Sequence, residues 1–529
     1  MVAPTGTAPP RARTLGALLA ELAAREPAAE CVVTAAGRAS RRDLLADAAR
    51  VAAALRRDGV GSGDRVALLL DNRAEWLAVA LGATAVGAVA APINTWVKAR
   101  DLEYLLGHAR PSVLVMLDAL GKQDYLAHLR EIMAGGGPPE LRRLVVVGGH
   151  VPPGATAYAD WVRSEAAELP DDARPDDVAL VLYTSGSTAR PKAVPLTHRH
   201  LIENGWAIGD RQGLTGEDRV FVSVPLAWAY GAANALMATL THGATLVLQS
   251  VFDAARAYPV LQRERCTAIY TLPVMTRALL DLPGFDATTL PQLRRGLTLG
   301  PPAELALVHD RLGVDAICNI YGSTEVYGNC CVTPHDAPFA RRAASQGPPL
   351  DGVEIRIADP RTREPLASGQ IGEILVRGRV TPGYLDDDRI ACPVVDDDGF
   401  FATGDLGSVD AQGWLTFVAR DSEMIKTAGI NVSPAEVEEF LATHPDVVEV
   451  AVVGAEAGER GQAVVAFVRL APSATTTPEE IQAWCRSQIA SYKAPVAVIP
   501  VTTMPTTATG KLARRDLVRR ATETLRGLP

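Results

Sequence analysis

Hydroxyl groups, a glycine and two cations are concentrated in one short stretch of the chain. Residues 178–183 are apolar and rich in β-branched and aromatic side chains, which predicts a buried strand. The next nine residues are Thr184, Ser185, Gly186, Ser187, Thr188, Ala189, Arg190, Pro191 and Lys192. Small residues leave backbone N–H groups free to surround an anion, hydroxyls add donors, and Lys192 adds positive charge. The stretch therefore predicts a loop that binds a polyphosphate.

This loop differs from a Walker A loop, which has a second glycine immediately before its lysine, where this chain has Pro191. A Ser/Gly-rich linker is the alternative, but linkers do not ordinarily follow a buried strand. Residues 183–194 resemble the phosphate loop of the adenylate-forming superfamily of acyl- and aryl-CoA ligases, peptide-synthetase adenylation domains and luciferases. Family loops usually carry Gly at Ala189 and Ala193, so we expect a stiffer or differently shaped loop.

A second motif follows the predicted strand at 220–224 and contains Trp228 and Tyr230. It is similar to the family's Pro-Leu-Phe-His motif, which helps line the acid pocket, and Trp228 replaces the usual His. Two aromatic side chains at a strand end could form a wall beside a flat substrate. Ordinary core packing is the alternative.

The segments 294–302 and 319–325 resemble the family's adenine-contacting turn and its Tyr-Gly-x-Thr-Glu signature. In the first, Leu299 replaces a Gly, and contacts to adenine, and at Gly300 also to the acid, are implied only for Gly300 and Pro301. In the second, the resemblance implies that Tyr321 and Gly322 contact the purine, that Thr324 binds the α-phosphate and that Glu325 holds Mg²⁺. Mg²⁺ prefers carboxylate and phosphate oxygens.

Three further positions carry the resemblance toward the C-terminus. Asp405 lies in a Thr-Gly-Asp motif and would accept hydrogen bonds from two ribose hydroxyls, although a solvated Asp in a hairpin turn is the alternative. Arg420 matches the family's ribose-binding Arg, with Ala419 in place of a Gly. Lys511 ends a Thr-Gly-Lys loop, and the resemblance implies a catalytic role; a surface lysine is the alternative.

The composition narrows the class of protein. The 529 residues exceed one ordinary core, and 48% are hydrophobic, as in globular proteins. A net charge of −9 argues against a nucleic-acid surface. The seven cysteines form no Cys-x-x-Cys pair, which favours reduced thiols and a cytoplasmic location over a disulfide framework or zinc site. The uncharged segment 76–93 predicts a buried helix and strand rather than a membrane span.

The alternation of helices and strands predicts an α/β fold. Residues 15–25 and 40–58 read as helices, and residues 65–70, 113–117 and 144–147 as strands, which indicates sheets sandwiched between helices. The pattern changes near Asp421. We therefore expect a large N-terminal domain, residues 1–420, with the ATP and acid sites, and a small mobile C-terminal α+β domain, residues 421–529.

The small domain contains three features that bear on its structure and role. Capping boxes at Ser433 and Thr477 predict two of its helices, and residues 424–430 predict a strand with Gly429 in a turn. The resemblance implies that Lys511 enters the site while the carboxyl group of an acid is adenylated, and that a thiol must later reach the carbonyl carbon of that acid. The family resemblance therefore implies that Asp421 is a hinge and that the face with Gly429 lines the path of the thiol.

The resemblance implies an acid–thiol ligase. A carboxylate attacks the α-phosphate of ATP to give acyl-AMP and pyrophosphate, with Thr188, Lys192, Glu325 and Lys511 as the catalytic residues. The acyl group then passes to a thiol, which we expect to be that of coenzyme A. Alternative acceptors are a carrier protein, an amine or nitrite. The second alternative is that the chain is a nucleotide-binding protein without ligase activity. The acid is expected to be aromatic or medium-sized and apolar, and a homodimer is left open.

Overall fold

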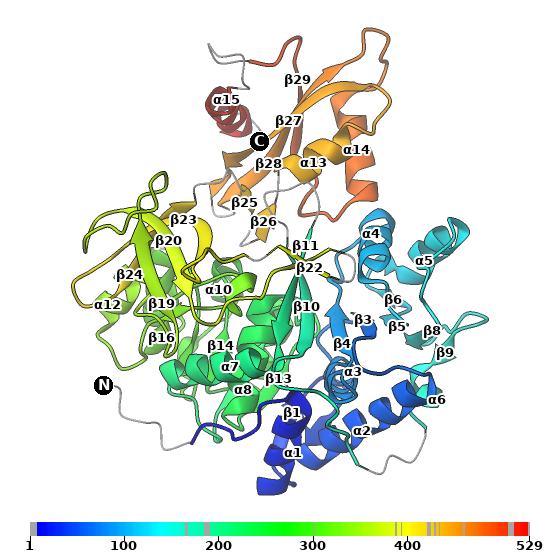
Figure 1. Cartoon of the computed structure of the whole chain (residues 1–529). Coiled ribbons are helices and arrows are strands. Elements are labelled where there is room, and N and C mark those ends of the chain that lie inside the picture. The colour runs from blue at the N-terminus through cyan, green and yellow to red at the C-terminus, as the bar shows by residue number, and fades with distance from the viewer. Residues whose placement is uncertain are drawn as a thin grey trace. The chain divides into compact units, whose positions relative to one another are not determined.

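The computed structural model describes residues 8–163, 168–184, 191–300, 302–386, 389–392, 394–420, 425–427, 430–432, 434–458, 461–505 and 513–526 (Figure 1). The chain divides into two compact units. The larger comprises residues 1–95, 105–182 and 193–419, and the smaller comprises residues 96–104, 183–192 and 420–529. The predicted α/β fold with a large and a small part is confirmed.

A nine-stranded sheet contains the strands on either side of the predicted phosphate loop. Its order is β22 (Arg389–Cys392), β21 (Tyr384–Asp386), β11 (Lys192–Thr197), β10 (Val178–Thr184), β4 (Val89–Pro92), β3 (Arg65–Leu69), β5 (Val113–Leu117), β8 (Arg143–Val147) and β9 (Thr156–Ala157). The strands from β10 to β9 pair in parallel. All five residues of β5 are buried, as expected for a parallel sheet covered on both faces.

The uncharged segment 76–93 forms a buried helix followed by a strand, as predicted. The helix α3 (Ala74–Ala85) is buried from Trp76 to its end. It packs on α2 (Arg41–Arg57) so closely that a Cβ on Gly82 would lie 2.7 Å from the Ala48 carbonyl oxygen. None of the helices that the structure describes has the length and apolar character needed to cross a bilayer.

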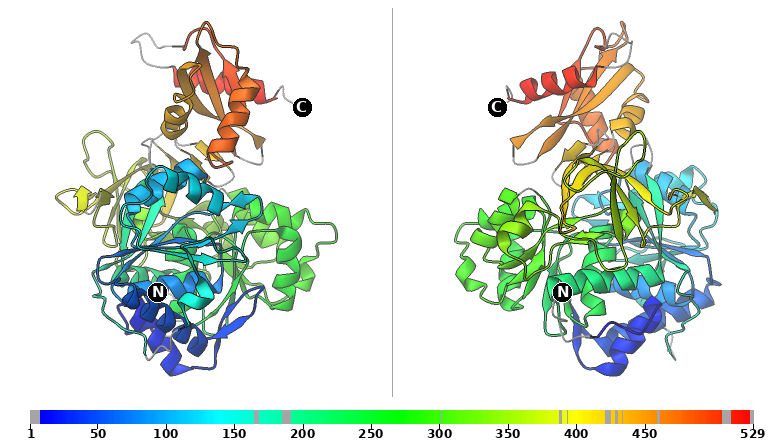
Figure 2. Two further views of the ribbon diagram at one scale, coloured as in Figure 1. Left: turned by 90° about the vertical axis from the view of Figure 1, so that its right-hand side faces the viewer. Right: turned by 60° about the vertical axis from the view of Figure 1, so that its left-hand side comes forward.

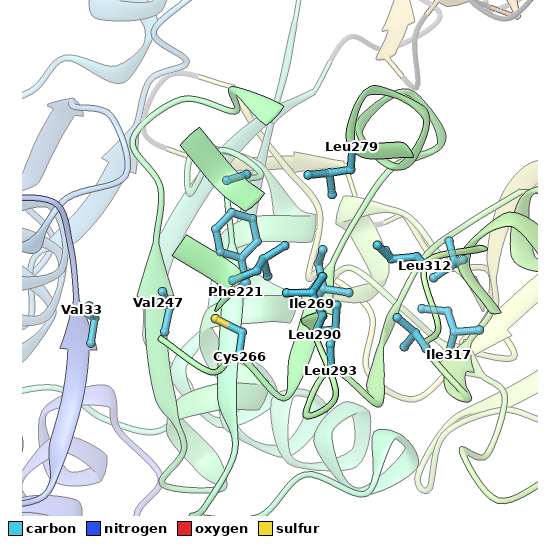
Figure 3. Close-up of a cluster of buried hydrophobic side chains, with 14 residues drawn as sticks. Val33, Phe221, Val247, Cys266, Ile269, Leu279, Leu290, Leu293, Leu312 and Ile317 are labelled. Atoms are coloured by element: carbon cyan, nitrogen blue, oxygen red, sulfur yellow. The ribbon is translucent and has the colours of Figure 1, made fainter. Parts of the chain in front are cut away.

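A seven-stranded sheet forms the second layer of the larger unit. Its order is β16 (Ala316–Cys318), β15 (Arg295–Leu297), β14 (Ala268–Tyr270), β12 (Arg219–Val222), β13 (Thr245–Leu248), β1 (Glu30–Val33) and β2 (Arg38–Ser40). Every pair except β1–β2 is parallel. Figure 3 shows the core beside it, where Val33, Val247, Phe221, Ile269 and Ile317 come from five of these strands. Because β12, β15 and β16 are parallel, the residues that follow them begin at one edge of the sheet.

A four-stranded sheet completes the larger unit, in the order β19 (Glu354–Ala358), β20 (Gly372–Arg377), β23 (Phe401–Val409) and β24 (Leu415–Arg420). Short pairs are formed by β17 (Ile320–Tyr321) with β18 (Cys331–Val332), and by β6 (Ala119–Leu120) with β7 (Gln123–Asp124). The longer helices besides α2 and α3 are α1 (Leu15–Arg25), α4 (Ala99–Ala109), α5 (Tyr125–Ala134), α7 (His198–Gln212), α9 (Ala254–Arg263) and α10 (Pro273–Leu280). The shorter ones are α6 (Tyr158–Trp161), η1 (Tyr230–Leu236), α8 (Met237–Thr241), η2 (Ala287–Thr289), α11 (Pro302–Ala306), η3 (Leu307–Arg311), η4 (Thr324–Val326) and α12 (Phe339–Ala344).

The smaller unit is built on β27 (Val447–Glu456), β28 (Gln462–Leu470) and β29 (Ala497–Pro500), shown in orange in Figure 2. Alternate residues of β27 face opposite sides. Val452 packs with α13 (Pro434–Leu441) and α14 (Pro478–Gln488), whereas Ala451 and Val453 pack with α15 (Arg514–Arg526). The sheet is therefore covered by helices on both faces.

The capping predictions are confirmed where their residues are described. Thr477 and Glu480 form the predicted capping box at α14, and Ser433 lies outside the described residues. A further capping box that was not predicted, Ser40 with Asp43, begins α2. The prediction of a single strand over 424–430 is wrong, because β25 (Ile425–Thr427) and β26 (Ile430–Val432) form an antiparallel hairpin.

Candidate active site

Several of the predicted site residues lie outside the described residues. They are Ser185, Gly186, Ser187, Thr188, Pro301, Asp421, Gly429 and Lys511, and the side chain of Arg420 also lies outside. Thr184 ends β10 and Lys192 begins β11, and these strands are neighbours in the nine-stranded sheet. The roles of these residues stay predictions.

Tyr321 and Asp405 are directly bonded, although 84 residues separate them. The Tyr321 hydroxyl donates to Oδ2 of Asp405 at 2.9 Å. Its ring stacks near Phe417, with centroids 5.9 Å apart and planes inclined by 25°. Burial, and after it the charge of Asp405, raises the pKa of Tyr321 well above its usual range, so the hydroxyl stays a donor. The structure thus brings the predicted purine and ribose contacts together.

The strand β23 fixes the position of Asp405. The N–H of Asp405 donates to the Thr403 hydroxyl at 3.1 Å, and that hydroxyl donates to the Ile374 carbonyl at 2.8 Å. An ionised carboxylate offers about four lone-pair sites, so Asp405 can accept bonds from a vicinal diol while it accepts the bond from Tyr321. This chemistry fits the predicted ribose contact.

The half-buried Glu325 lies in the 3-10 turn η4 and is held at its backbone and its side chain. The N–H of Thr381 donates to the Glu325 carbonyl at 2.7 Å, and the Tyr384 hydroxyl donates to its Oε1 at 2.9 Å. Tyr384 is not among the residues predicted from the sequence. Its adjacent Gly383 marks a turn, but nothing in the sequence connects it with a residue 59 positions earlier.

The turn that carries Glu325 ends at Tyr327, which has a positive φ of 59°. The Tyr327 hydroxyl contacts the N–H and the hydroxyl of Thr197, each at 3.1 Å. Its carbonyl accepts a bond from the Asn204 amide at 3.0 Å. A non-glycine residue in this region is uncommon and persists where its surroundings hold it, as these three bonds do.

At two of the predicted site positions, the local structure requires or strongly favours a glycine. A Cβ on Gly322 would lie 2.3 Å from the Gly328 carbonyl oxygen, which leaves no room for a side chain. Gly300 has a φ of +141°, a conformation that side-chain-bearing residues rarely adopt. Contact of either glycine with a nucleotide stays a prediction.

The predicted acid-pocket aromatics precede and begin a π-helix, η1. Trp228 is half-buried, and its carbonyl accepts the N–H groups of Gly231 and Ala232. The Tyr230 hydroxyl donates to the carbonyls of Leu297 and Thr271, at 2.9 and 3.2 Å. Burial raises the pKa of Tyr230 well above its ordinary value. Tyr230 therefore orients its ring between the ends of β14 and β15, and its hydroxyl is committed to two carbonyls.

The segment predicted to line the acid pocket lies beside the turn of Glu325. A Cβ built on Gly328 would lie 3.4 Å from the carbonyl oxygen of Ala229. The loops after β12, β15 and β16 thus meet at the carboxyl edge of a parallel sheet, where α/β proteins commonly bind ligands.

The donor set near Glu325 fits one cation that is shared with a nucleotide. Among the described residues, no group of three or more His, Cys, Asp or Glu side chains is arranged to hold a metal ion. Mg²⁺ is typically bound through one or two carboxylates together with substrate phosphates and water. The single, positioned carboxylate of Glu325 is compatible with that mode of binding.

Residues 19–385 match the AMP-binding enzyme family, and residues 436–511 match the AMP-binding enzyme C-terminal domain. The chain belongs to the AMP-binding enzyme family. The predicted membership of the adenylate-forming superfamily is therefore confirmed.

Individual relatives of this AMP-binding enzyme span almost its whole length. YngI of Bacillus subtilis strain 168, which carries the name of an acyl-CoA synthetase, is 32% identical over 496 residues, covering 90% of each chain. A feruloyl-CoA synthase of an Amycolatopsis species is 33% identical over 481 residues, covering 90% of this chain and 93% of its own. The amide bond synthetase McbA of Marinactinospora thermotolerans has a similar structure, with a TM-score of 0.83, 26% identity, and coverage of 96% and 99%.

Proposed function

We propose that this protein is an ATP-dependent acid–thiol ligase that forms an acyl-CoA or aryl-CoA thioester through acyl-AMP. The match to both AMP-binding families, in order along one chain, carries the proposal. The bonded pair Tyr321–Asp405 and the positioned Glu325 support it, because they offer a ribose acceptor and a cation ligand within one unit.

The reaction has two steps. A carboxylate oxygen of the acid attacks the α-phosphorus of ATP, and pyrophosphate leaves. A thiol sulfur then attacks the acyl carbonyl, AMP leaves, and the thiol proton is released. Both reactants of the first step are anions, so positioning and positive charge lower the barrier.

The residues of this chain bind ATP and the acid, orient them for the attack and supply positive charge. Asp405 holds the ribose and Tyr321 lies along the purine, while the loop ending at Lys192 binds the β- and γ-phosphates. Glu325 would hold Mg²⁺, which would neutralise phosphate charge during the attack. Lys511 contacts the carboxylate and the α-phosphate oxygens, and Arg420 contacts the ribose. No side-chain nucleophile takes part.

The acid is expected to be apolar and flat or medium-sized. The half-buried aromatic segment 228–230 favours this class, and one of the relatives is a feruloyl-CoA synthase. Transfer to an amine is the second candidate, because the structural relative McbA is an amide bond synthetase. The domain boundary at residue 420 and a cytoplasmic location belong to the same proposal, and a homodimer is left open.

A two-stage assay with the purified full chain tests the function. ATP, MgCl₂ and a panel of hydroxycinnamic, benzoic and medium-chain acids are supplied, and acyl-AMP and pyrophosphate are measured. Coenzyme A, an amine, nitrite or a carrier protein is then added, and the product is identified by mass. We expect acid-dependent pyrophosphate release and a CoA thioester. ATP binding without adenylation of any acid would indicate a nucleotide-binding protein, and preferential amide formation would favour the amine.

A further inference from the structure

The segment 381–384 holds Glu325 at two points. The backbone N–H of Thr381 fixes the Glu325 carbonyl at 2.7 Å, and the hydroxyl of Tyr384 contacts the carboxylate at 2.9 Å. A glutamate side chain has three rotatable bonds, so the backbone contact alone does not orient its carboxylate. Because the Tyr384 bond ends on Oε1, it orients the carboxylate and fixes where Oε2 points.

The same segment is attached to the strand that leaves the predicted phosphate loop. The Thr381 hydroxyl donates to the Pro195 carbonyl at 2.7 Å. One residue beyond Tyr384, Leu385 of β21 pairs with Ala193 of β11. Lys192, the cation of the predicted phosphate loop, immediately precedes Ala193 in the chain. Hydrogen bonds of the segment 381–385 therefore fix the position of Glu325 relative to β11.

The chemistry of the donor suits this task. A neutral hydroxyl orients a carboxylate without cancelling its charge, whereas an Arg or Lys in that place would compete with a cation for it. Residues that bond to a metal ligand tune metal affinity by holding the ligand in place. We propose that Tyr384 is a positioning residue that presents the Glu325 carboxylate to the divalent cation of the metal–ATP complex. This inference rests on the proposed function.

The substitution Tyr384→Phe tests the inference because it removes the hydroxyl and keeps the ring. The probe is Mn²⁺ with α,β-methylene-ATP, an analogue whose α–β bridge is not cleaved in adenylation. Affinity is measured by calorimetry and the Mn²⁺ environment by electron paramagnetic resonance. We expect affinity for the metal–analogue complex to fall about tenfold. Affinity for metal-free AMP and the thermal midpoint should stay near the wild-type values.

Two controls isolate the effect from a general loss of structure. Tyr258→Phe removes a hydroxyl that bonds the Asp286 carbonyl and the Thr289 hydroxyl instead of Glu325, and it should leave the metal–analogue affinity unchanged. In a Glu325→Ala background, Tyr384→Phe should have no further effect, because the residue acts through the missing carboxylate. Unchanged affinity in Tyr384→Phe, or additive losses in the double variant, would overturn the inference.

The outcomes also separate this inference from the proposed function. If Mn²⁺ fails to strengthen analogue binding in the wild-type protein, the metal-dependent ligase function is wrong. If Mn²⁺ strengthens binding in the wild type and Tyr384→Phe behaves identically, the function stands and only the positioning role is wrong.

Discussion

The hydroxyl of Tyr321 lies 2.9 Å from the carboxylate of Asp405 and donates a hydrogen bond to it. This bond joins the short strand β17 to the strand β23, so the two predicted nucleotide contacts form one structural unit. The orientation of the Tyr321 ring and the acceptor geometry of Asp405 are coupled through it.

The first prediction separates the two partners of this bond. Asp405→Ala should weaken AMP binding by roughly 1.5–3 kcal/mol, because it removes a charged acceptor of hydroxyl bonds. Tyr321→Phe should weaken AMP binding by only about 0.5–1.5 kcal/mol, because it removes one neutral donor and keeps the ring. Calorimetry with AMP measures both. Unchanged affinity in Asp405→Ala would place the ribose elsewhere.

The second prediction concerns Lys511, whose role is inferred from the sequence. Lys511→Ala should slow adenylation on the order of 10²-fold or more, because one preorganised charge leaves the reacting centre. ATP binding should be nearly unchanged. Single-turnover formation of acyl-AMP is the measurement, and Arg519→Ala, which removes an exposed cation of α15, is the control. A wild-type rate in Lys511→Ala would contradict the catalytic assignment.

The third prediction concerns pH and His198. Its Nδ1 accepts the N–H of Leu15 at 3.0 Å, and burial lowers its pKa from 6.5 to about 4. The folded pKa lies below the unfolded one, so the unfolded chain binds the proton first as the pH falls. The contribution of neutral His198 to the free energy of unfolding is complete above pH 6.5. As the pH falls from 6.5 to 4, this contribution of about 3 kcal/mol is lost.

The substitution His198→Asn isolates this contribution. The Asn oxygen can accept the Leu15 N–H but does not titrate. Urea unfolding at pH 7.5 and pH 5 should show a smaller acid loss of stability in the variant than in the wild type. His242, whose pKa burial also lowers to about 4, keeps its own share in both proteins. Equal acid losses would mean that His198 does not contribute.

The fourth prediction concerns the start of the π-helix. A Cβ on Gly231 would lie 2.1 Å from the carbonyl oxygen of Pro225, a backbone atom that cannot move without displacing the strand end. Gly231→Ala should destabilise the protein by about 1–3 kcal/mol and weaken acid binding. Gly107→Ala is the matched control, because its Cβ meets nothing within 4 Å and α4 should gain about 0.5–1 kcal/mol. Thermal unfolding of both variants, and acid titration of Gly231→Ala, provide the comparison.

Local sequence signals predicted the elements well. The predicted capping box Thr477–Glu480 begins α14 because side chains three residues apart satisfy backbone N–H groups without tertiary help. The hairpin β25–β26 cannot be distinguished from one strand by its sequence, since two short strands and one longer strand share the same composition. Periodicity reports which residues are buried but does not mark where a short chain segment reverses.

Contacts between residues far apart in the sequence are the part of the site that the sequence does not predict. The family resemblance named Tyr321, Glu325 and Asp405, but no local pattern shows that Tyr321 bonds Asp405. Tyr384 was missed because its function depends on a contact 59 residues away, which arises only when β21 pairs with β11. Groups with recognisable chemistry can thus be predicted from the sequence, whereas the tyrosine that orients one of them cannot.

The last prediction concerns Asp421, which follows Arg420 at the predicted boundary between the domains. In the proposed mechanism, adenylation requires Lys511 near the acid and the α-phosphate, whereas the second step requires a thiol at the carbonyl carbon of the adenylated acid. A single fixed arrangement cannot easily serve both steps, so we expect the small domain to rotate and to bring the face with Gly429 toward the acyl group. Rotation about one residue requires a large change in its φ and ψ.

Proline at this position should restrict that change, because its ring fixes φ near −65° and removes the N–H. Asp421→Pro should therefore favour one conformer and slow one half-reaction far more than the other. We expect adenylation to survive and thioester formation to fail. Single-turnover measurement of acyl-AMP formation, and of CoA transfer from preformed acyl-AMP, provides the test. Asp421→Ala is the control, because it removes the carboxylate but leaves φ free, and it should support both steps. If Asp421→Pro slows both steps equally, or neither, the hinge lies elsewhere or the domains do not alternate.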